Sequence, residues 1–196
     1  MTKVSPSSAG ERRRLATRTT VKRTVLFLLR KGGYRELTYE RIAARSGVAK
    51  STLYRHWPSK AELVFDLVLH DRDLPSLAPT GSGDGDVAAL ADRMLAFVGG
   101  GVAARVFPGV LADVADDPAL RQRFMESFVL GSQPELRPVL ERIAADRGSA
   151  LQRPVEDYQA ILVGSVFAWL HVGGLSAAET RERLIRLVDD VVRGHG

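Results

Sequence analysis

Apolar side chains recur every three or four residues along most of the chain, and no stretch keeps the strict alternation of a half-buried β-strand. Turn-forming Gly, Pro, Ser and Thr residues interrupt this pattern and divide it into segments. We expect helices over residues 14–31, 38–45, 49–56, 59–71, 87–98, 102–115, 117–130, 135–147, 154–172 and 176–193. The sequence therefore predicts an all-α protein.

Several of these segments begin or end with residues that are typical of helix termini and loops. Thr38 is suited to cap the second helix, and Ser59 followed by Glu62 is the sequence of a capping box at the start of the fourth. Residues 72–85 are rich in Pro, Gly and Ser, which makes them the best candidate for a loop between domains.

Glycines and prolines also occur inside the C-terminal helical segments. Three consecutive glycines at 99–101 are expected to separate two helices. Pro108 is expected near a helix start. Gly131 with Pro134 is expected to break or kink a helix, because proline lacks a backbone N–H and its ring collides with the preceding turn.

Residues 37–63, LTYERIAARSGVAKSTLYRHWPSKAEL, contain two short helical patterns that meet at Ser46-Gly47. A helix-turn-helix needs a tight, glycine-containing connection of this kind. No Asp or Glu occurs between Arg41 and Lys60, and the second helix is rich in polar and basic residues. A helix that faces phosphates and base edges requires such a surface, whereas a merely solvated helix more often carries carboxylates too.

Charge divides the chain in the same way. Residues 1–60 hold 15 Lys plus Arg and 3 acidic residues (net +12), and residues 61–196 hold 13 and 20 (net −7), which together give the +5 of the whole chain. A polyanionic partner is therefore expected for the N-terminal part alone. A basic membrane-surface helix would have bulky apolar residues opposite its charges and no helix-turn-helix beside it, so double-stranded DNA is favoured and no membrane partner is expected.

Nothing in the sequence indicates catalysis, a metal site or a cofactor. There are no cysteines, and His70, His171 and His195 are isolated from one another, so neither a metal site nor a histidine-based triad is indicated. Adjacent aspartate pairs at 116–117 and 189–190 point to different sides of their helices, which does not favour paired acid–base chemistry. No apolar run reaches the roughly 18 residues of a membrane span, and the N-terminus lacks the apolar segment of a secretory signal. We expect a cytoplasmic protein that is not an enzyme.

Over residues 18–68 the chain resembles the TetR family of transcriptional regulators (TetR/AcrR-type). The matching residues are Gly33-Tyr34, Thr38, Gly47, Val48, Thr52-Leu53-Tyr54, Trp57, Lys60 and Glu62-Leu63. Beyond them only the all-helical length and layout agree. The resemblance implies an N-terminal three-helix helix-turn-helix DNA-binding domain at 14–60 and a C-terminal helical ligand-binding and dimerisation domain at 61–196, connected by the helix at 59–71. The Ser, Pro and charged residues before them predict a disordered tail at 1–13.

The polar face of the helix at 49–56 is expected to read DNA, because Lys and Arg favour guanine and Thr can contact the thymine methyl group. A solvated basic face is the alternative. The resemblance implies phosphate contacts from Tyr54, His56 and Lys60, whereas Trp57 is expected in the core. Glu40 departs from the basic preference and weakens the case for base contacts from the preceding helix. The predicted DNA-binding residues are Thr38, Tyr39, Arg41, Lys50, Ser51, Thr52, Tyr54, Arg55, His56 and Lys60.

For the C-terminal part the resemblance implies a ligand cavity and a dimer interface. The cavity would take a small apolar or aromatic effector; its guessed lining is Phe97, Phe107, Phe124, Phe128, Tyr158 and Phe167. A plain aromatic core is the alternative. The last two helices would form a homodimer through Ile161, Gly164, Ser165, Ala168, Leu184, Leu187, Val188 and Val191. An internal core stripe is the alternative there.

Together these features predict a TetR-like transcriptional regulator. It would be a repressor that binds a palindromic operator as a homodimer and is released by a small-molecule effector. One alternative is a DNA-organising or protein-recruiting member of the same fold without an effector, and a DNA-binding assay with effectors would separate the two. A small helical enzyme has the least support, because no catalytic constellation is present.

Overall fold

The computed structural model describes residues 9–70 and 73–194, and within these ranges the chain is helical with turns and loops and has no strand. The helices are α1 (Ala9–Gly32), α2 (Tyr39–Ser46), α3 (Lys50–His56), α4 (Lys60–Val64), α5 (Gly83–Gly99), α6 (Val102–Asp116), α7 (Pro118–Phe124), α8 (Gly131–Asp146), α9 (Val155–Phe167) and α10 (Ala177–Arg193). π-Helical segments continue α4, α7 and α9, namely η1 (Phe65–His70), η2 (Met125–Leu130) and η3 (Ala168–Val172). The predicted all-α fold is confirmed.

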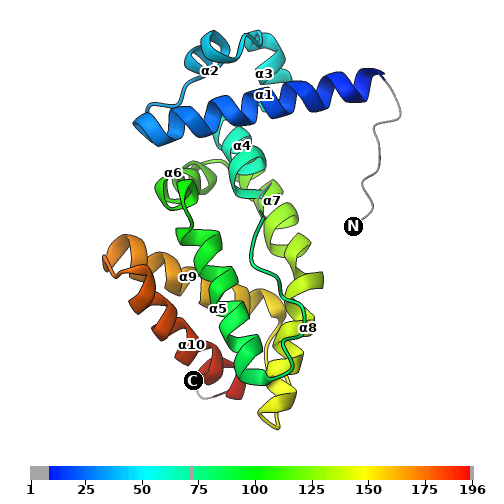
Figure 1. Ribbon diagram of the computed structural model, residues 1–196, viewed down its shortest axis with the longest axis vertical. Coiled ribbons are helices and arrows are strands. Elements are labelled where there is room, and N and C mark those ends of the chain that lie inside the picture. Colours follow the sequence, from blue (N-terminus) through cyan, green and yellow to red (C-terminus); the bar gives the residue numbers. More distant parts are fainter. Residues whose placement is uncertain (1–8, 71–72, 195–196) are drawn as a thin grey trace.

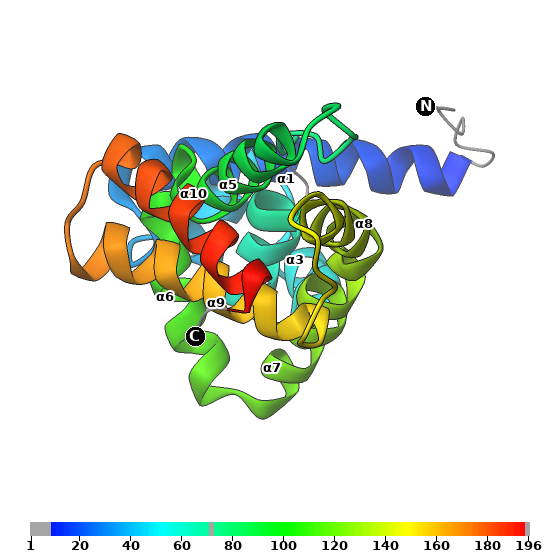
Figure 2. The same cartoon turned by 90° about the horizontal axis from the view of Figure 1, so that it is seen from below.

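The helices form two groups along the long axis of the molecule (Figure 1). Helices α1, α2 and α3 form a head at one end, and α5, α8, α9 and α10 pack together at the other end, which we call the body. Helix α4 leads from the head towards the body, and α6 lies against both α1 and α4. Seen from the body end, α9 and α10 lie side by side, and α5 packs against α10 (Figure 2).

Local sequence explains where several helices begin. The side chain of Thr38 caps α2 by accepting a hydrogen bond from a backbone N–H of its first turn, at 3.3 Å. Ser59 and Glu62 form a complete capping box at α4, and Ser176 and Glu179 form another at α10. These contacts satisfy N–H groups that have no partner within the helix. The predicted caps at Thr38 and Ser59 are therefore confirmed.

The head rests on α6 through a close contact at Tyr34. Its hydroxyl donates a hydrogen bond to the Asp113 carboxylate at 2.5 Å, and its ring lies against Gly109, where a Cβ atom would come within 2.3 Å of the ring. Arg105 of α6 donates a hydrogen bond to the carbonyl of Arg30 at 2.9 Å. These contacts fix the orientation of α1 relative to α6.

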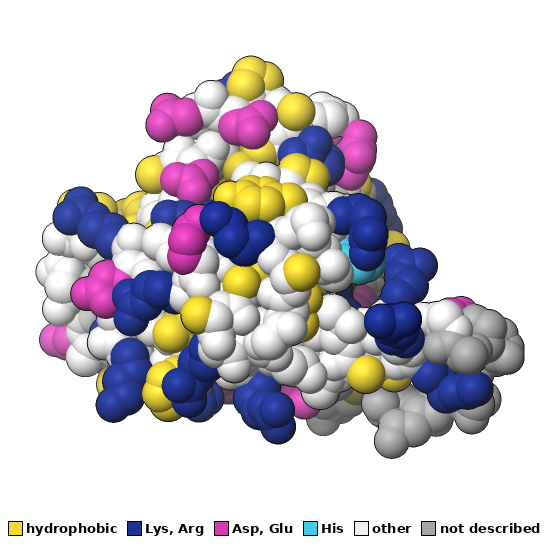
Figure 3. Space-filling model, turned by 90° about the horizontal axis from the view of Figure 1, so that it is seen from above, with side chains coloured by type: hydrophobic (Ala, Val, Ile, Leu, Met, Phe, Trp, Pro, Cys, Tyr) yellow, Lys and Arg dark blue, Asp and Glu magenta, His cyan; other side chains and the backbone are white. Residues whose placement is uncertain are grey.

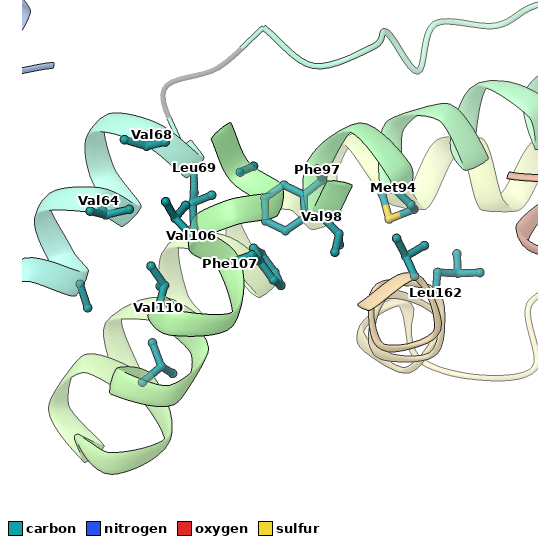
Figure 4. Packing of buried hydrophobic residues seen from close by; sticks show 14 of the residues in the cluster. Val64, Val68, Leu69, Met94, Phe97, Val98, Val106, Phe107, Val110 and Leu162 are labelled. Atoms are coloured by element: carbon teal, nitrogen blue, oxygen red, sulfur yellow. The ribbon is translucent and has the colours of Figure 1, made fainter. Parts of the chain in front are cut away.

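Aliphatic packing continues this junction into the body. Val64, Val68 and Leu69 of the α4–η1 segment are 0–2% exposed and lie close to Val106 and Val110 of α6, which are fully buried (Figure 4). Burial of each such side chain contributes about 1.5–3 kcal/mol relative to leaving it in water. The connecting helix is therefore part of the core, so a shift of α6 must be transmitted to it.

The first helix begins earlier than the sequence pattern suggested. α1 starts at Ala9, so residues 9–13, which were assigned to a disordered tail, are helical. Ala, Glu and Arg have high helix propensity, and Glu11 in the first turn also suits the helix dipole. The rest of the predicted tail, residues 1–8, and His195 lie outside the described residues.

Prolines are tolerated inside two helices, α6 and α8. Pro108 lies within α6 rather than near its start. Pro134 lies within α8, so the helix that was expected to break or kink at Gly131 and Pro134 is not broken there. Pro134 has no N–H to donate to the carbonyl of Leu130, which is the last residue of η2. The π-helical segment η2 therefore ends at Leu130, the residue whose carbonyl lacks the α-helical hydrogen bond from position 134.

Within the described residues, no single helix is both long and apolar enough to cross a membrane. Helices α5 and α6 meet these criteria only as a pair, and the pair is bent by 69°.

Candidate nucleic-acid interface

The turn between α2 and α3 is held by one glycine and a buried apolar contact. Gly47 has a φ of 72°, in the left-handed region, and its N–H donates to the carbonyl of Ala43 at 3.0 Å. On the inner side, Ile42, Leu53 and Trp57 are at most 5% exposed, which confirms Trp57 as a core residue. With these side chains buried, the opposite face of α3 must face solvent.

That outer face carries most of the residues predicted to contact DNA. Lys50, Ser51, Tyr54 and Arg55 are exposed, whereas Thr52 and His56 are half-buried. Lys and Arg side chains are numerous on the end of the molecule that carries the head (Figure 3). α3 thus presents hydroxyl, amino and guanidinium groups together on one helix face, which is the chemistry that phosphates and base edges require.

Glu40, the acidic residue of α2, is balanced by an ion pair. It pairs with Lys50, and Arg41 pairs with Glu36 at 2.8 Å. The Lys50 ammonium, which donates a hydrogen bond to Glu40, holds the pKa of that carboxyl below its usual value. Both pairs are exposed to solvent, and such pairs are weak, so phosphates or base edges can compete for Lys50 and Arg41.

The predicted DNA contact from Tyr39 is not supported. Its side chain is 7% exposed, and its hydroxyl donates to the carbonyl of Trp57 at 2.5 Å. Burial raises the pKa of this phenol well above its usual value. Its ring lies against that of Tyr54, with centroids 4.2 Å apart, so Tyr39 supports an exposed aromatic residue rather than reaching DNA itself. Three residues before Ile42, it shares that residue's buried helix face.

Two further predicted residues sit at helix starts. Thr38 is exposed, but its hydroxyl already caps α2. Lys60 is half-buried; its Nζ lies 3.5 Å from the carbonyl oxygen of Tyr34 and 4.1 Å from the centroid of that ring. A phosphate contact from Lys60 stays a prediction.

A groove of about 550 Å³ runs between the start of α1 and α3. Its basic lining comes from Arg13 and Arg14 on α1 and from Arg55 on α3, and Thr17 and Thr52 add hydroxyl groups. The sequence prediction did not include these α1 residues: it placed Arg13 in a disordered tail, and it assigned Arg14 to the first helix without a DNA contact. The signal was present, since a run of three arginines, at positions 12–14, lies at the predicted start of the first helix.

One carboxylate connects the head to the π-helical segment η1. Asp66 forms an ion pair with Arg18 of α1 and accepts a hydrogen bond from Nε1 of Trp57 at 2.7 Å. Partial burial raises the pKa of Asp66, but the hydrogen bonds from Arg18 and Trp57 outweigh it, and the net pKa lies below the usual value. A movement of η1 would therefore act on α1 and on the end of α3 together.

Comparisons with known proteins agree with this geometry. The family model for bacterial regulatory proteins of the tetR family matches residues 26–67, and the model for tetracyclin repressor-like C-terminal domains matches residues 77–191. The chain belongs to the TetR family. This is a family of transcriptional regulators that bind DNA through a helix-turn-helix, and the protein is therefore a regulator and not an enzyme.

Relatives of this chain support the same assignment. Uncharacterized HTH-type transcriptional regulators of Mycobacterium bovis and Mycobacterium tuberculosis are 30% identical to this chain over 168 residues, which covers 85% of this chain and 81% of each relative. The crystal structure of the TetR family transcription regulator SCO0332 superposes with a TM-score of 0.67 at 25% identity, covering 88% of this chain and 97% of that one.

The body of this TetR-family regulator separates the six aromatic residues that were predicted to line one pocket. Phe97 and Phe128 line an apolar cavity of about 40 Å³ between α5, α8, α9 and η2. Phe124 lines a different cleft, at the junction with the head. Phe107 and Tyr158 are at most 1% exposed, and Phe167 packs against Phe107, so these three belong to the core around the cavity rather than to its wall.

The residues predicted for the dimer interface also divide into two groups. Leu184 and Val188 are fully buried and Val191 is 9% exposed in a single chain, because α10 packs against α5. Their assignment to the interface is not supported. The remaining predicted residues are accessible, and these are Ile161, Gly164, Ser165, Ala168 and Leu187. A Cβ atom at Gly164 would meet nothing within 4 Å, so this glycine faces open space.

Proposed function

We propose that this TetR-family regulator is a repressor whose homodimer binds a palindromic operator and is released by a small effector. The observation that carries the DNA-binding site is the outer face of α3, where polar and basic side chains stand on a buried apolar base without a carboxylate. We divide the chain into a DNA-binding part at 14–60 and a regulatory part at 61–196, connected by the segment at 59–71. We also propose that the protein acts in the cytoplasm.

The exposed residues of α3 suggest a division of labour on DNA. Lys50, Ser51, Thr52 and Arg55 are suited to base edges, because they occupy the start and middle of a helix that can enter the major groove. Phosphate contacts would come from the flanks of this helix, namely from Thr38, Arg41, Tyr54, His56 and Lys60. The α1–α3 groove with Arg13 and Arg14 would add phosphate contacts of its own.

The accessible face of α9 supports a homodimer. Ile161, Ser165 and Ala168 recur at helical spacing, with Gly164 between them and no side chain filling the space in front of it. Helices can approach closely where such small residues lie. Two heads related by a two-fold axis would read two half-sites of opposite orientation, and hence a palindrome.

Release by an effector requires that the effector bind the non-DNA arrangement of the heads more tightly than the DNA-bound one. The coupling would run through α4 and η1, since Asp66 holds both α1 and the end of α3. A coupling free energy of about 1–3 kcal/mol would lower operator affinity by roughly 5- to 150-fold. A DNA-organising protein on the same fold would bind DNA with no such response.

Selection of bound sequences from a random pool of duplex DNA tests the proposal. We expect one palindromic motif for the wild-type protein. Lys50→Ala and Arg55→Ala should each change the preferred bases, at a cost of about 1–3 kcal/mol for a good base contact. Arg137→Ala, an exposed arginine on α8, is the control and should leave the motif intact. Unchanged base preference in both α3 variants would show that α3 does not read the operator.

A further inference from the structure

The small cavity in the body contains one polar group that the fold does not satisfy. Gln159 of α9 lines the cavity and is 5% exposed. Most of the wall around it is apolar and consists of Leu74, Met94, Phe97, Phe128, Leu136 and Val163. The Oε1 atom of Gln159 is buried and has no hydrogen-bond partner among the described residues. A buried acceptor without a donor lowers the stability of the fold, so a ligand that brings a donor group to this position would gain binding free energy.

Its neighbours fix the orientation of the Gln159 amide. The Nε2 group donates to Oγ of Ser132 at 3.0 Å and to the carbonyl of Phe128 at 3.4 Å. Ser132 uses its own hydrogen to donate to the carbonyl of Val129 at 3.1 Å, so it meets Gln159 as an acceptor. Reversing the amide would place Oε1 against the Phe128 carbonyl, two acceptors facing each other. The unpartnered atom is therefore the oxygen, which can only accept.

The charge at the cavity wall is already balanced. Arg93 lines the cavity, and its guanidinium pairs with Glu135 and donates to the carbonyl of Pro75 at 2.8 Å. A charged ligand would have to break this pair or enter an apolar space unpaired. The chemistry therefore favours a neutral ligand.

The size of the cavity indicates how a ligand would enter. A volume of about 40 Å³ holds at most a few water molecules, whereas ligand pockets measure roughly 300–1,000 Å³. The ring of Phe128 is stacked on Phe97, with centroids 4.2 Å apart and planes 20° apart. Phe128 is half-buried and lies on the π-helical segment η2, so its ring can be displaced with less loss of packing than the buried Phe97 or Leu136. Removing its ring leaves a flat slot on Phe97 beside Gln159.

We propose that this cavity binds a neutral aromatic molecule with one hydrogen-bond donor. The ring of the ligand takes the place of the Phe128 ring on Phe97, and its hydroxyl or N–H donates to Oε1 of Gln159. The inference rests on the proposed function, because it specifies the effector of the repressor. Phe128 also contacts Phe65 and Phe124, at centroid distances of 6.3 and 5.1 Å. Phe65 directly precedes Asp66, so displacement of Phe128 reaches the carboxylate that holds the head.

Two small probes of nearly the same size test the donor requirement, namely phenol and fluorobenzene. Phe128→Ala opens the slot in the full-length protein, and calorimetry gives the affinity of each probe. We expect phenol to bind about tenfold more tightly or better, because only phenol can satisfy Gln159. In wild-type protein phenol should raise the melting temperature more than fluorobenzene, and this comparison holds even if Phe128→Ala does not fold.

Two further substitutions in the Phe128→Ala variant identify the group that is responsible for the preference for phenol. Adding Gln159→Leu should abolish the preference for phenol, whereas adding Ser132→Ala should preserve it, because Ser132 holds the Nε2 side of the amide. Equal affinities for the two probes, or a phenol preference that survives Gln159→Leu, would overturn the proposal and leave a cavity for water alone. Selection of operator DNA by the wild-type protein is independent of these titrations, so failure here is distinguishable from failure of the proposed DNA binding.

Discussion

The head and the body use their side chains in different ways. In the head, most residues that were predicted to meet DNA stand on the outer face of α3, and Tyr39 is the one whose side chain turns inward. In the body, the residues predicted for a pocket or an interface are divided: some lie in the core, as Tyr158 and Leu184 do with 0% exposure, and others, such as Ile161 and Ala168, stay accessible. The polar residues predicted for the head thus lie mostly at its surface, whereas the apolar residues predicted for the body are shared between core and surface.

The physical reason for this difference is the cost of burying charge. Lys and Arg side chains cannot be buried without a partner, so a cluster of them on one helix face must remain at the surface. Leu, Val and Phe side chains gain free energy from any apolar contact, whether it is core, cavity or dimer interface. A stripe of basic residues in the sequence therefore predicts a position at the surface. A stripe of apolar residues does not show whether it lies in the core, at a cavity or at a dimer interface.

The strongest test of this contrast concerns the one apolar face of the body that stays accessible. Ile161→Glu combined with Ala168→Glu should yield monomers, because it places charge at the proposed α9 interface. Loss of the linked second half-site should lower operator affinity by roughly 10²- to 10⁴-fold. Sedimentation and DNA titration measure both effects. Leu130→Glu, at a residue 52% exposed on η2, should leave the dimer intact. A dimer that survives the double change would place the interface elsewhere.

A comparison within α10 separates core from surface. Leu184→Ala should lower the free energy of unfolding by about 2–5 kcal/mol, because Leu184 is fully buried and its loss leaves a cavity. Leu187→Ala removes the same atoms from a half-buried position and should cost less. Urea denaturation of both variants in the Ile161→Glu, Ala168→Glu background measures the two losses without a contribution from dimerisation. Equal losses would contradict the division of α10 into core and accessible positions.

In the head, the basic residues of the α1–α3 groove should strengthen DNA binding through phosphate contacts without affecting which bases are preferred. Arg13→Ala with Arg14→Ala should lower the salt slope of DNA binding by about two units, one for each lost phosphate contact, with the base preference unchanged. The exposed pair Arg183→Ala with Arg186→Ala on α10 is the matched control and should leave the slope as it was. A changed base preference in the α1 variant would mean that α1 reads DNA directly.

The smallest expected effect is the loss of stability caused by Asp66→Asn, at the junction between the head and η1. Because the folded-state pKa of Asp66 is below its unfolded value near 3.9, its stabilisation is present above about pH 4 and is lost as pH falls through the folded value. Asparagine can still accept from Trp57 but cannot pair with Arg18. Thermal unfolding should therefore show the variant less stable than the wild type at pH 7, with a smaller difference at pH 3. A gap of the same size at both pH values would mean that the charge of Asp66 is not the cause.

Much of the head was predictable because its signals are local. A cap at Thr38, a capping box from Ser59 to Glu62, and a glycine at position 47 each act within one or two turns of the chain. The polar face of α3 follows directly, because its apolar residues have only one side on which to pack. The start of α1 was missed for a related reason, since a charged segment with high helix propensity was assigned by its Ser and Pro neighbours.

The sequence by itself determined the helices, the helix-turn-helix, the sign of its partner's charge and the family resemblance. Only the tertiary structure decided that Tyr39 points inward, that Leu184 and Val188 serve the core, and that Phe97 and Phe128 share a wall with Gln159. These outcomes depend on which helix faces meet across the chain, as α10 meets α5. Helical periodicity specifies that a face is apolar, but the partner of that face is chosen by packing between segments far apart in sequence.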